Sequence, residues 1–213
     1  FYQQRTQSTG NPCIMEMTRS REASVLNFQP ACRSGGFHLP DYWVWCGSPI
    51  LGDDGTCHLF ASRWSKQLSF NPHWLTHSEI VRATAPKPEG PYTFAEVVLP
   101  ARGREFWDGR MTHNPAIVQR NGQLLLFYTG TTYSGPSPTP ADGLSARDLG
   151  AGEEARKQAD PRVIEAHRNQ RIGVAVAERP EGPWRRADVP ALEPRLGCWD
   201  ALMTTNPAPC AAP

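Results

Sequence analysis

The sequence predicts an all-β protein made of repeated units of four short antiparallel strands. The first observation is an internal repeat, in which residues 78–121 align without a gap on residues 170–213, at an offset of 92. The second is a pair of turn signals, Asp-Gly at 54–55 and Asn-Gly at 121–122, each placed between apolar runs as in a β-hairpin. The third is composition, since 21 Pro, 18 Gly and 7 Trp suit a fold rich in strands and turns.

The internal repeat matches whole motifs rather than scattered residues. The identical positions include Ile80/Ile172, Ala83/Ala175, Glu89-Gly90-Pro91/Glu181-Gly182-Pro183, Trp107-Asp108/Trp199-Asp200, Met111-Thr112/Met203-Thr204 and Asn114-Pro115-Ala116/Asn206-Pro207-Ala208. Such self-similarity indicates that the chain stacks copies of one supersecondary unit.

The first unit can be followed strand by strand. Its predicted strands cover residues 42–51, 56–64, 78–83 and 93–99. Four antiparallel strands in succession are the layout of a β-propeller blade. The hairpin of this unit also matches the repeat, and we align its Ser48-Pro49 with Asn114-Pro115.

The second unit carries an insertion, residues 134–168. The first part is rich in Ser, Gly and Pro and is predicted as a loop. The second part predicts two short helices, over 153–159 and 161–167, with Asp160 as the cap and Pro161 in the first helical position. Without the insertion the repeat period falls to roughly 55 residues, close to the length of known propeller blades.

The predicted domain is an incomplete propeller. A third unit begins at residue 170, so residues 41–213 hold two to three blades, whereas a closed propeller has at least four. Residues 1–40 lack strong periodicity and are predicted as an irregular lead-in.

Charge and composition exclude several classes of function. Lys and Arg number 22 against 21 Asp and Glu, which gives no electrostatic case for a nucleic acid or an anionic membrane. The sequence shows no long apolar run and no signal peptide. The six Cys form no Cys-x-x-Cys pair, and Pro72 and a strand context argue against a zinc site at His73-x-x-x-His77. We predict no metal site and no cofactor.

A series of short motifs carries a family resemblance. In chain order they are Trp45…Ser48, Asp54-Gly55…His58, Ser62-Arg63-Trp64, His77-Ser78-Glu79-Ile80, Glu89–Tyr92, Trp107-Asp108 and His113–Ile117. Their order and spacing over residues 41–210 resemble the five-bladed β-propeller glycoside hydrolases around family 43, the fold of arabinanases, levansucrases and invertases.

This resemblance implies hydrolysis of O-glycosidic bonds of an oligo- or polysaccharide in a funnel along the propeller axis. Such hydrolysis needs two carboxyl groups across the scissile bond, one protonated and one ionised. It also benefits from aromatic faces that stack on sugar rings. Enzymes of this type are often exported, so a secreted or periplasmic location is expected, while the oligomeric state is not predicted.

One departure from the family pattern concerns the acids. Typical members carry carboxylates beside the Pro of the innermost strands, where this chain has Ser48-Pro49, Asn114-Pro115 and Asn206-Pro207. The predicted catalytic acids are therefore taken from elsewhere, and they are Asp41, Asp108 and Glu79. The alternative is a non-catalytic sugar-binding propeller, or an inactive hydrolase homologue.

Each predicted acid also has a structural interpretation. Asp108 recurs as Asp200, which favours a turn-capping role because a catalytic group is needed only once. Glu79 shares a strand face with His77, and that face is either a site or a solvated outer surface. Asp41 is the acid nearest to the first inner strand.

The predicted sugar-binding residues are polar or aromatic. His113 breaks the repeat, since Thr205 stands in the other copy. The Arg63 guanidinium has the geometry to hold a carboxylate or a sugar oxygen, or to form a structural ion pair. The full predicted set is Trp45, Ser48, Arg63, Trp107, His113, Asn114, Asp200 and Asn206.

Overall fold

The computed structural model describes residues 32–149 and 153–210. Most of the predicted lead-in, residues 1–31, therefore lies outside the described residues. The part of the lead-in that is described makes single bridges from Phe37 to Tyr92 and from Leu39 to Tyr42.

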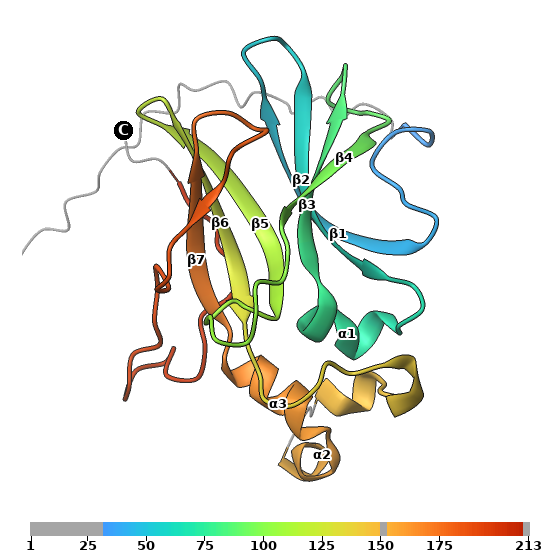
Figure 1. Cartoon of the computed structure of the whole chain (residues 1–213), viewed down its shortest axis with the longest axis vertical. Helices are drawn as coiled ribbons and strands as arrows, with labels where there is room; N and C mark the ends of the chain where they lie inside the picture. Colours follow the sequence, from blue (N-terminus) through green and yellow to red (C-terminus); the bar gives the residue numbers. More distant parts are fainter. Residues whose placement is uncertain (1–31, 150–152, 211–213) are drawn as a thin grey trace, which may run out of the picture. The chain divides into compact units, whose positions relative to one another are not determined.

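The described chain is mostly β and forms two four-stranded antiparallel sheets, each with its strands in sequential order (Figure 1). We call them blade 1 and blade 2. Blade 1 consists of β1 (Tyr42–Leu51), β2 (Cys57–Ser65), β3 (Glu79–Ala85) and β4 (Thr93–Leu99). Blade 2 consists of β5 (Met111–Arg120), β6 (Gln123–Thr131), β7 (Arg171–Ala177) and β8 (Arg185–Arg186). The predicted all-β class and the four-stranded units are confirmed, while closure into five blades stays a prediction.

The two blades share one hydrophobic core. Phe60 and Ile80 of blade 1 and Leu126 and Tyr128 of blade 2 are all fully buried in the same cluster. Burial of aromatic and aliphatic side chains at this density is the main stabilising contribution to the pair of sheets. The two blades therefore pack against each other through these apolar side chains.

A β-bulge interrupts each innermost strand at an equivalent place, and it corrects the predicted hairpin alignment. The pairing skips two residues after Trp45 in β1 and two residues after His113 in β5. Cys46 and Asn114 then both have φ of 49°, the left-handed region that few side chains other than Asn and Asp adopt easily. Cys46, and not Ser48, is thus the counterpart of Asn114, because the shorter turn of the second hairpin shifts the register by two residues.

Five helices lie outside the sheets in the described ranges. They are α1 (Phe70–His77), the 3₁₀ turns η1 (Pro140–Asp142) and η2 (Ala146–Leu149), α2 (Glu153–Gln158) and α3 (Pro161–Arg168). None of these is long and apolar enough to cross a membrane. The two helices predicted in the insertion are confirmed, and the Asp160 side chain caps α3 by accepting from the Arg162 amide.

The strand context expected around His73 and His77 is wrong, because α1 occupies that segment. Pro72 does not prevent the helix, since Asn71 is still non-helical and Pro72 falls in the first turn, where its missing N–H is not needed. The insertion packs on this helix through a second buried cluster that joins Leu75 to Tyr133 and Val163.

Candidate functional site

A pocket of about 300 Å³ opens between blade 1, helix α1 and the bulged strands. We call it the aromatic pocket. Its lining residues are Trp45, Trp64, Phe70, Asn71, Trp74, His113, Asn114 and Asn206. No carboxylate and no permanently charged side chain belongs to this set.

The walls of the aromatic pocket are rings from three different elements. Trp45 comes from β1, Trp64 from β2, and Phe70 and Trp74 from α1. Phe70 packs against both indoles of the sheet, with ring centroids 5.5 Å from Trp45 and 4.9 Å from Trp64. Trp45 remains half exposed at 51%. Aromatic walls with one exposed face are suited to a ligand that offers a flat apolar surface.

His113 forms a polar part of the pocket wall and lies between two indoles. Its ring centroid is 5.0 Å from that of Trp74 and 5.8 Å from that of Trp64. Burial lowers the pKa of His113 to about 3, so the imidazole is neutral near pH 7. Its Nδ1 is 2.8 Å from the Ser78 hydroxyl, which leaves Nε2 as the ring nitrogen for a ligand.

Asn114 and Asn206 form the other polar part of the wall. Both residues have positive φ, 49° and 55°, and the Asn114 side-chain amide donates to Oδ1 of Asn206. The backbone amides of the two residues donate to hydroxyls of the preceding blade, Ser62 Oγ at 2.9 Å and Thr129 Oγ1 at 3.1 Å. The repeat thus brings two equivalent amide side chains together.

Two polar atoms of the pocket residues are buried and have no hydrogen-bond partner among the described residues. They are Trp64 Nε1, a donor, and Asn114 Oδ1, an acceptor. A buried polar atom without a partner costs about 1–3 kcal/mol, so such atoms commonly mark the place of a ligand or water.

The predicted acid Glu79 is held outside the aromatic pocket by Arg63. The Arg63 Nε lies 2.9 Å from Glu79 Oε1, across the β2–β3 pairing, and the guanidinium stacks on the rings of Tyr42 and Phe94. The two predicted site residues, Arg63 and Glu79, therefore form an ion pair with each other.

The predicted acid Asp108 lies in the interior of blade 2 and is fully buried. Its carboxylate accepts from Arg102 Nε at 2.6 Å, from the Tyr128 hydroxyl at 2.7 Å and from Arg186 at 3.4 Å. Trp107 beside it stacks on Tyr128 at 5.7 Å and does not reach the aromatic pocket. Both predicted residues thus hold blade 2 together.

The remaining predicted residues divide between the surface and the blade contacts. Asp41 is exposed at the turn before β1, and its backbone carbonyl accepts from the Lys66 amide. The Ser48 hydroxyl accepts from the Ile117 amide of the neighbouring blade at 3.0 Å. Asp200 pairs with Arg195 at 2.9 Å and does not line the aromatic pocket. The aromatic pocket unites four of the predicted residues, Trp45, His113, Asn114 and Asn206.

Four pocket residues were missed by the sequence reasoning, and they are Trp64, Phe70, Asn71 and Trp74. The sequence offered a way to identify Trp64 as a site residue, since it ends the Ser-Arg-Trp motif. The other three come from the α1 segment, for which the sequence analysis predicts a strand context, and a predicted helix over this segment is the signal that could have found them.

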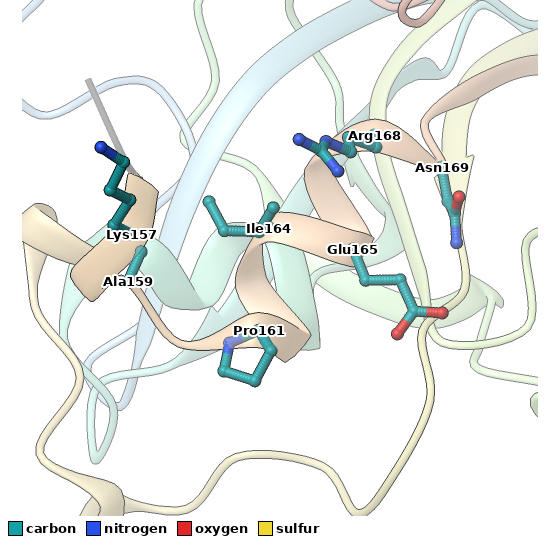
Figure 2. Close-up of a pocket in the computed structure, with 7 residues that line it drawn as sticks. All are labelled: Lys157, Ala159, Pro161, Ile164, Glu165, Arg168 and Asn169. Carbon is teal, nitrogen blue, oxygen red and sulfur yellow. The ribbon is translucent and has the colours of Figure 1, made fainter. Parts of the chain in front are cut away.

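A larger hollow, of about 590 Å³, lies on the insertion (Figure 2). It is lined by Lys157, Ala159, Pro161, Ile164, Glu165, Arg168 and Asn169. It has no aromatic wall, and its one carboxylate, Glu165, accepts from the amide and hydroxyl of Ser134. We therefore take the smaller aromatic pocket as the candidate site.

Comparisons with known proteins identify the fold. No family model matches the chain, and no curated protein matches it. Among solved structures it is similar to Zg3597, a family 117 glycoside hydrolase from the marine bacterium Zobellia galactanivorans, with a TM-score of 0.55 and 17% identity. That overlay covers 81% of this chain and 47% of the hydrolase, so the chain spans about half of its length.

Two further similar structures belong to family 43. The GH43_1 enzyme of Xanthomonas citri, solved with xylotriose, overlays with a TM-score of 0.44 and 20% identity over 72% of this chain and 34% of its own. CoXyl43, a β-xylosidase/α-arabinofuranosidase from a compost metagenome, overlays with a TM-score of 0.46 and 16% identity over 73% and 38%. The resemblance found in the motifs is confirmed at the level of the fold, on the overlay with the family 117 enzyme.

Proposed function

We propose that the aromatic pocket binds one sugar ring of an oligosaccharide. The observation that carries this proposal is the combination of four aromatic rings with an unpartnered buried donor and acceptor, Trp64 Nε1 and Asn114 Oδ1. A sugar ring presents C–H groups on its faces and hydroxyls at its edge, so a single ligand would satisfy both kinds of surface.

The polar groups of the pocket are uncharged, which suits hydroxyl groups rather than ions. His113 is neutral near pH 7, and Asn114 and Asn206 offer amide donors and acceptors. Each hydroxyl can both donate and accept, so it pairs with any of these groups. The half-exposed Trp45 leaves room for neighbouring sugar units outside the pocket.

Trp74 is the residue to remove in a binding test, because it lines the pocket and faces His113. We expect Trp74→Ala to weaken binding of the best ligand from an oligosaccharide panel by about tenfold, or about 1.4 kcal/mol, measured by titration calorimetry. Trp199→Ala is the matched control, since Trp199 is exposed and does not line this pocket. Equal binding by both variants would place the ligand elsewhere.

Hydrolysis of the bound oligosaccharide is the second candidate function, and the fold shared with the family 117 hydrolase favours it. Glycoside hydrolysis uses two carboxyl groups about 5–10 Å apart. Among the predicted acids, Glu79 is paired with Arg63, and Asp108 is enclosed by Arg102 and Tyr128. Asp41 is the exposed one, so we propose it as the first carboxylate to test.

The activity test compares two exposed acids. If the protein hydrolyses aryl-glycosides or oligosaccharides through Asp41, Asp41→Asn abolishes sugar release and leaves ligand affinity unchanged. Asp53→Asn is the control, because Asp53 is an exposed residue of the β1–β2 turn. A wild-type protein that binds an oligosaccharide and releases no sugar would instead establish a binding propeller.

A further inference from the structure

Ser78 does not line the aromatic pocket, but its side chain contacts a pocket residue whose two ring nitrogens can exchange roles. Ser78 lies between α1 and β3, at the C-cap of the helix, and is only 2% exposed. Its hydroxyl is 2.8 Å from Nδ1 of His113. A neutral imidazole carries its hydrogen on either nitrogen, and the hydrogen bond made by one nitrogen decides what the other nitrogen offers.

The Ser78 hydroxyl has one hydrogen and, within residues 32–149 and 153–210, one hydrogen-bond partner. That partner is Nδ1 of His113. If Nδ1 carried the imidazole hydrogen and donated it to the Ser78 oxygen, the hydroxyl hydrogen of Ser78 would be buried without an acceptor. Folded proteins rarely leave a buried donor in that state, because desolvation of the donor is then not compensated. The hydroxyl of Ser78 therefore donates to Nδ1.

This direction places the hydrogen of the imidazole on Nε2. The ring of His113 is neutral near pH 7, and its Nδ1 accepts the hydrogen of Ser78. The hydrogen of a neutral imidazole must then be on the other nitrogen. The ring lies between those of Trp64 and Trp74, which restrict its rotation. His113 therefore offers the pocket a hydrogen-bond donor and not an acceptor.

The second copy of the repeat makes the corresponding bond in the opposite direction. Gln170 aligns with Ser78, and Thr205 aligns with His113. The Thr205 hydroxyl donates to Oε1 of Gln170 at 3.2 Å, and the amide nitrogen of Gln170 donates to the His167 carbonyl. The residue in the place of His113 is thus the donor of this bond, and it has no ring nitrogen left for a ligand. The Ser–His pair supplies that nitrogen in the first copy.

The neighbouring amides supply the opposite polarity in the pocket wall. The Asn114 side chain donates through Nδ2 to Oδ1 of Asn206, which leaves Oδ1 of Asn114 as an acceptor. This oxygen is buried and has no hydrogen-bond partner in the described part of the chain. A sugar hydroxyl both donates and accepts. A wall that combines the Nε2 donor of His113 with the Oδ1 acceptor of Asn114 therefore matches hydroxyl groups in both directions.

We propose that Ser78 is a positioning residue that holds His113 as the Nε2–H tautomer, so that His113 donates to a hydroxyl oxygen of the bound sugar. The ligand is the sugar of the proposed function, on which the proposal rests, whereas the tautomer is a property of the free protein. The aromatic pocket then favours ligands that bring an acceptor oxygen to His113 and a hydroxyl hydrogen to Asn114.

The tautomer is measured on the free protein by ¹⁵N NMR of the imidazole at pH 7. A ring nitrogen with hydrogen and one without differ in chemical shift, and the signals of His113 are identified by their loss in His113→Thr. We expect Nε2 to carry the hydrogen and Nδ1 to be unprotonated. Ser78→Ala should shift the Nδ1 signal, since the donated hydrogen bond is lost, and Ser78→Thr should leave it in place. An Nδ1 that carries hydrogen in the wild type, in a neutral or a charged ring, would overturn the proposal, and this result does not depend on the folding of any Ser78 variant.

Oligosaccharide binding separates positioning from a purely structural role. With the best ligand of the panel, we expect Ser78→Ala to weaken affinity by about three- to tenfold, the effect of one hydrogen bond, and Ser78→Thr to restore it. Thr112→Val is the matched control, because it removes another buried hydroxyl between β3 and β5 without contacting the imidazole. Unchanged affinity in Ser78→Ala, or an equal loss in Ser78→Ala and Thr112→Val, would contradict the positioning role.

The two measurements also distinguish failure of this proposal from failure of the proposed function. If the wild type binds no oligosaccharide, the proposed function is wrong and the donation to a sugar is overturned with it, whereas the NMR measurement still reads the tautomer. If Trp74→Ala weakens binding and Ser78→Ala does not, the pocket is the binding site and only the positioning role of Ser78 is overturned.

Discussion

Two contacts between successive units of the repeat, which we call joints, involve equivalent backbone positions and differ in their side chains. Between blades 1 and 2, Ser78 bonds His113 at 2.8 Å. Between blade 2 and segment 203–210, the equivalent residues are Gln170 and Thr205, bonded at 3.2 Å. The imidazole of the first joint reaches two Trp rings and helps to form the aromatic pocket, and the Thr of the second joint does not.

Residues shared by the two copies of the repeat make the contacts between neighbouring strands, which we call the frame, and residues that differ between the copies form the candidate site. The frame includes Thr112 and Thr204, and Asn114 and Asn206, which make the same contacts at both joints. The pocket adds residues with no counterpart in the second copy. These are His113 itself and the α1 side chains Phe70 and Trp74, since helix α3, which holds the matching place in the repeat, carries Arg162 and Ala166 at these two positions.

The largest expected difference between the joints concerns the two Asp residues. Asp108→Asn leaves Arg102 and Arg186 without their buried counter-charge, so we expect a loss of about 3–5 kcal/mol in the free energy of unfolding. Asp200→Asn should change stability by less than about 1 kcal/mol, because its partner Arg195 is mostly exposed. Urea unfolding of both variants measures this difference in stability, and equal losses would mean that Asp200 is as fully enclosed as Asp108.

The threonines provide a test of intermediate size. Thr112 Oγ1 donates to the Leu99 carbonyl and accepts from the Ile80 amide, and all of these groups are buried. Thr112→Val should therefore cost about 2 kcal/mol, since both backbone groups lose their partner away from water.

Thr204→Val is the matched variant for the second joint. Thr204 Oγ1 donates to the Leu192 carbonyl and accepts from the Ile172 amide, and both Leu192 and Ile172 are partly exposed. Water can replace these bonds, so we expect a loss of less than about 1 kcal/mol. Denaturant unfolding compares the two variants, and a larger effect at Thr204 would show that the second joint is the tighter one.

The sequence was sufficient to predict the two blades because their strands and turns follow repeated patterns. Hairpin turns, alternating apolar residues and the 92-residue offset predicted both blades and the insertion helices, since each depends on local or repeated patterns. The alignment of Ser48 failed because hairpins with turns of different length shift the register, and this shift is visible only once Cys46 and Asn114 are seen at the bulges.

The sequence was less informative about the site because burial and pairing decide which acids are free. Nothing in the chain order reveals that Arg63 holds Glu79, or that Arg102 holds Asp108. The aromatic pocket also depends on α1, which is held by distant segments: the hydroxyl of Tyr133, just before the insertion, donates to the carbonyl of Thr76, and Val163 of the insertion packs in one cluster with Leu75. Such contacts between distant segments are not encoded in any short motif.

Near neutral pH the smallest expected difference between the joints is the titration of His113, and this difference grows as the pH falls. Its pKa in the folded protein is about 3, below the ordinary value near 6.5 of the unfolded chain, because burial disfavours the charged imidazole. The unfolded state therefore binds more protons between pH 6.5 and 3. The stability that depends on neutral His113 is complete above pH 6.5 and falls as the pH drops below it, by at most about 1.4 kcal/mol per pH unit.

The double variant Ser78→Gln/His113→Thr installs the residues of the second joint at the first and removes this titration. We expect its unfolding free energy to depend less steeply on pH than that of the wild type between pH 6.5 and 4. The slope that remains belongs to the other buried imidazoles, chiefly His77, whose pKa burial lowers to about 4. Urea unfolding at several pH values measures the difference. Parallel curves for the two proteins would mean that His113 takes up its proton without unfolding the joint, and then the first joint would differ from the second only in the pocket it forms.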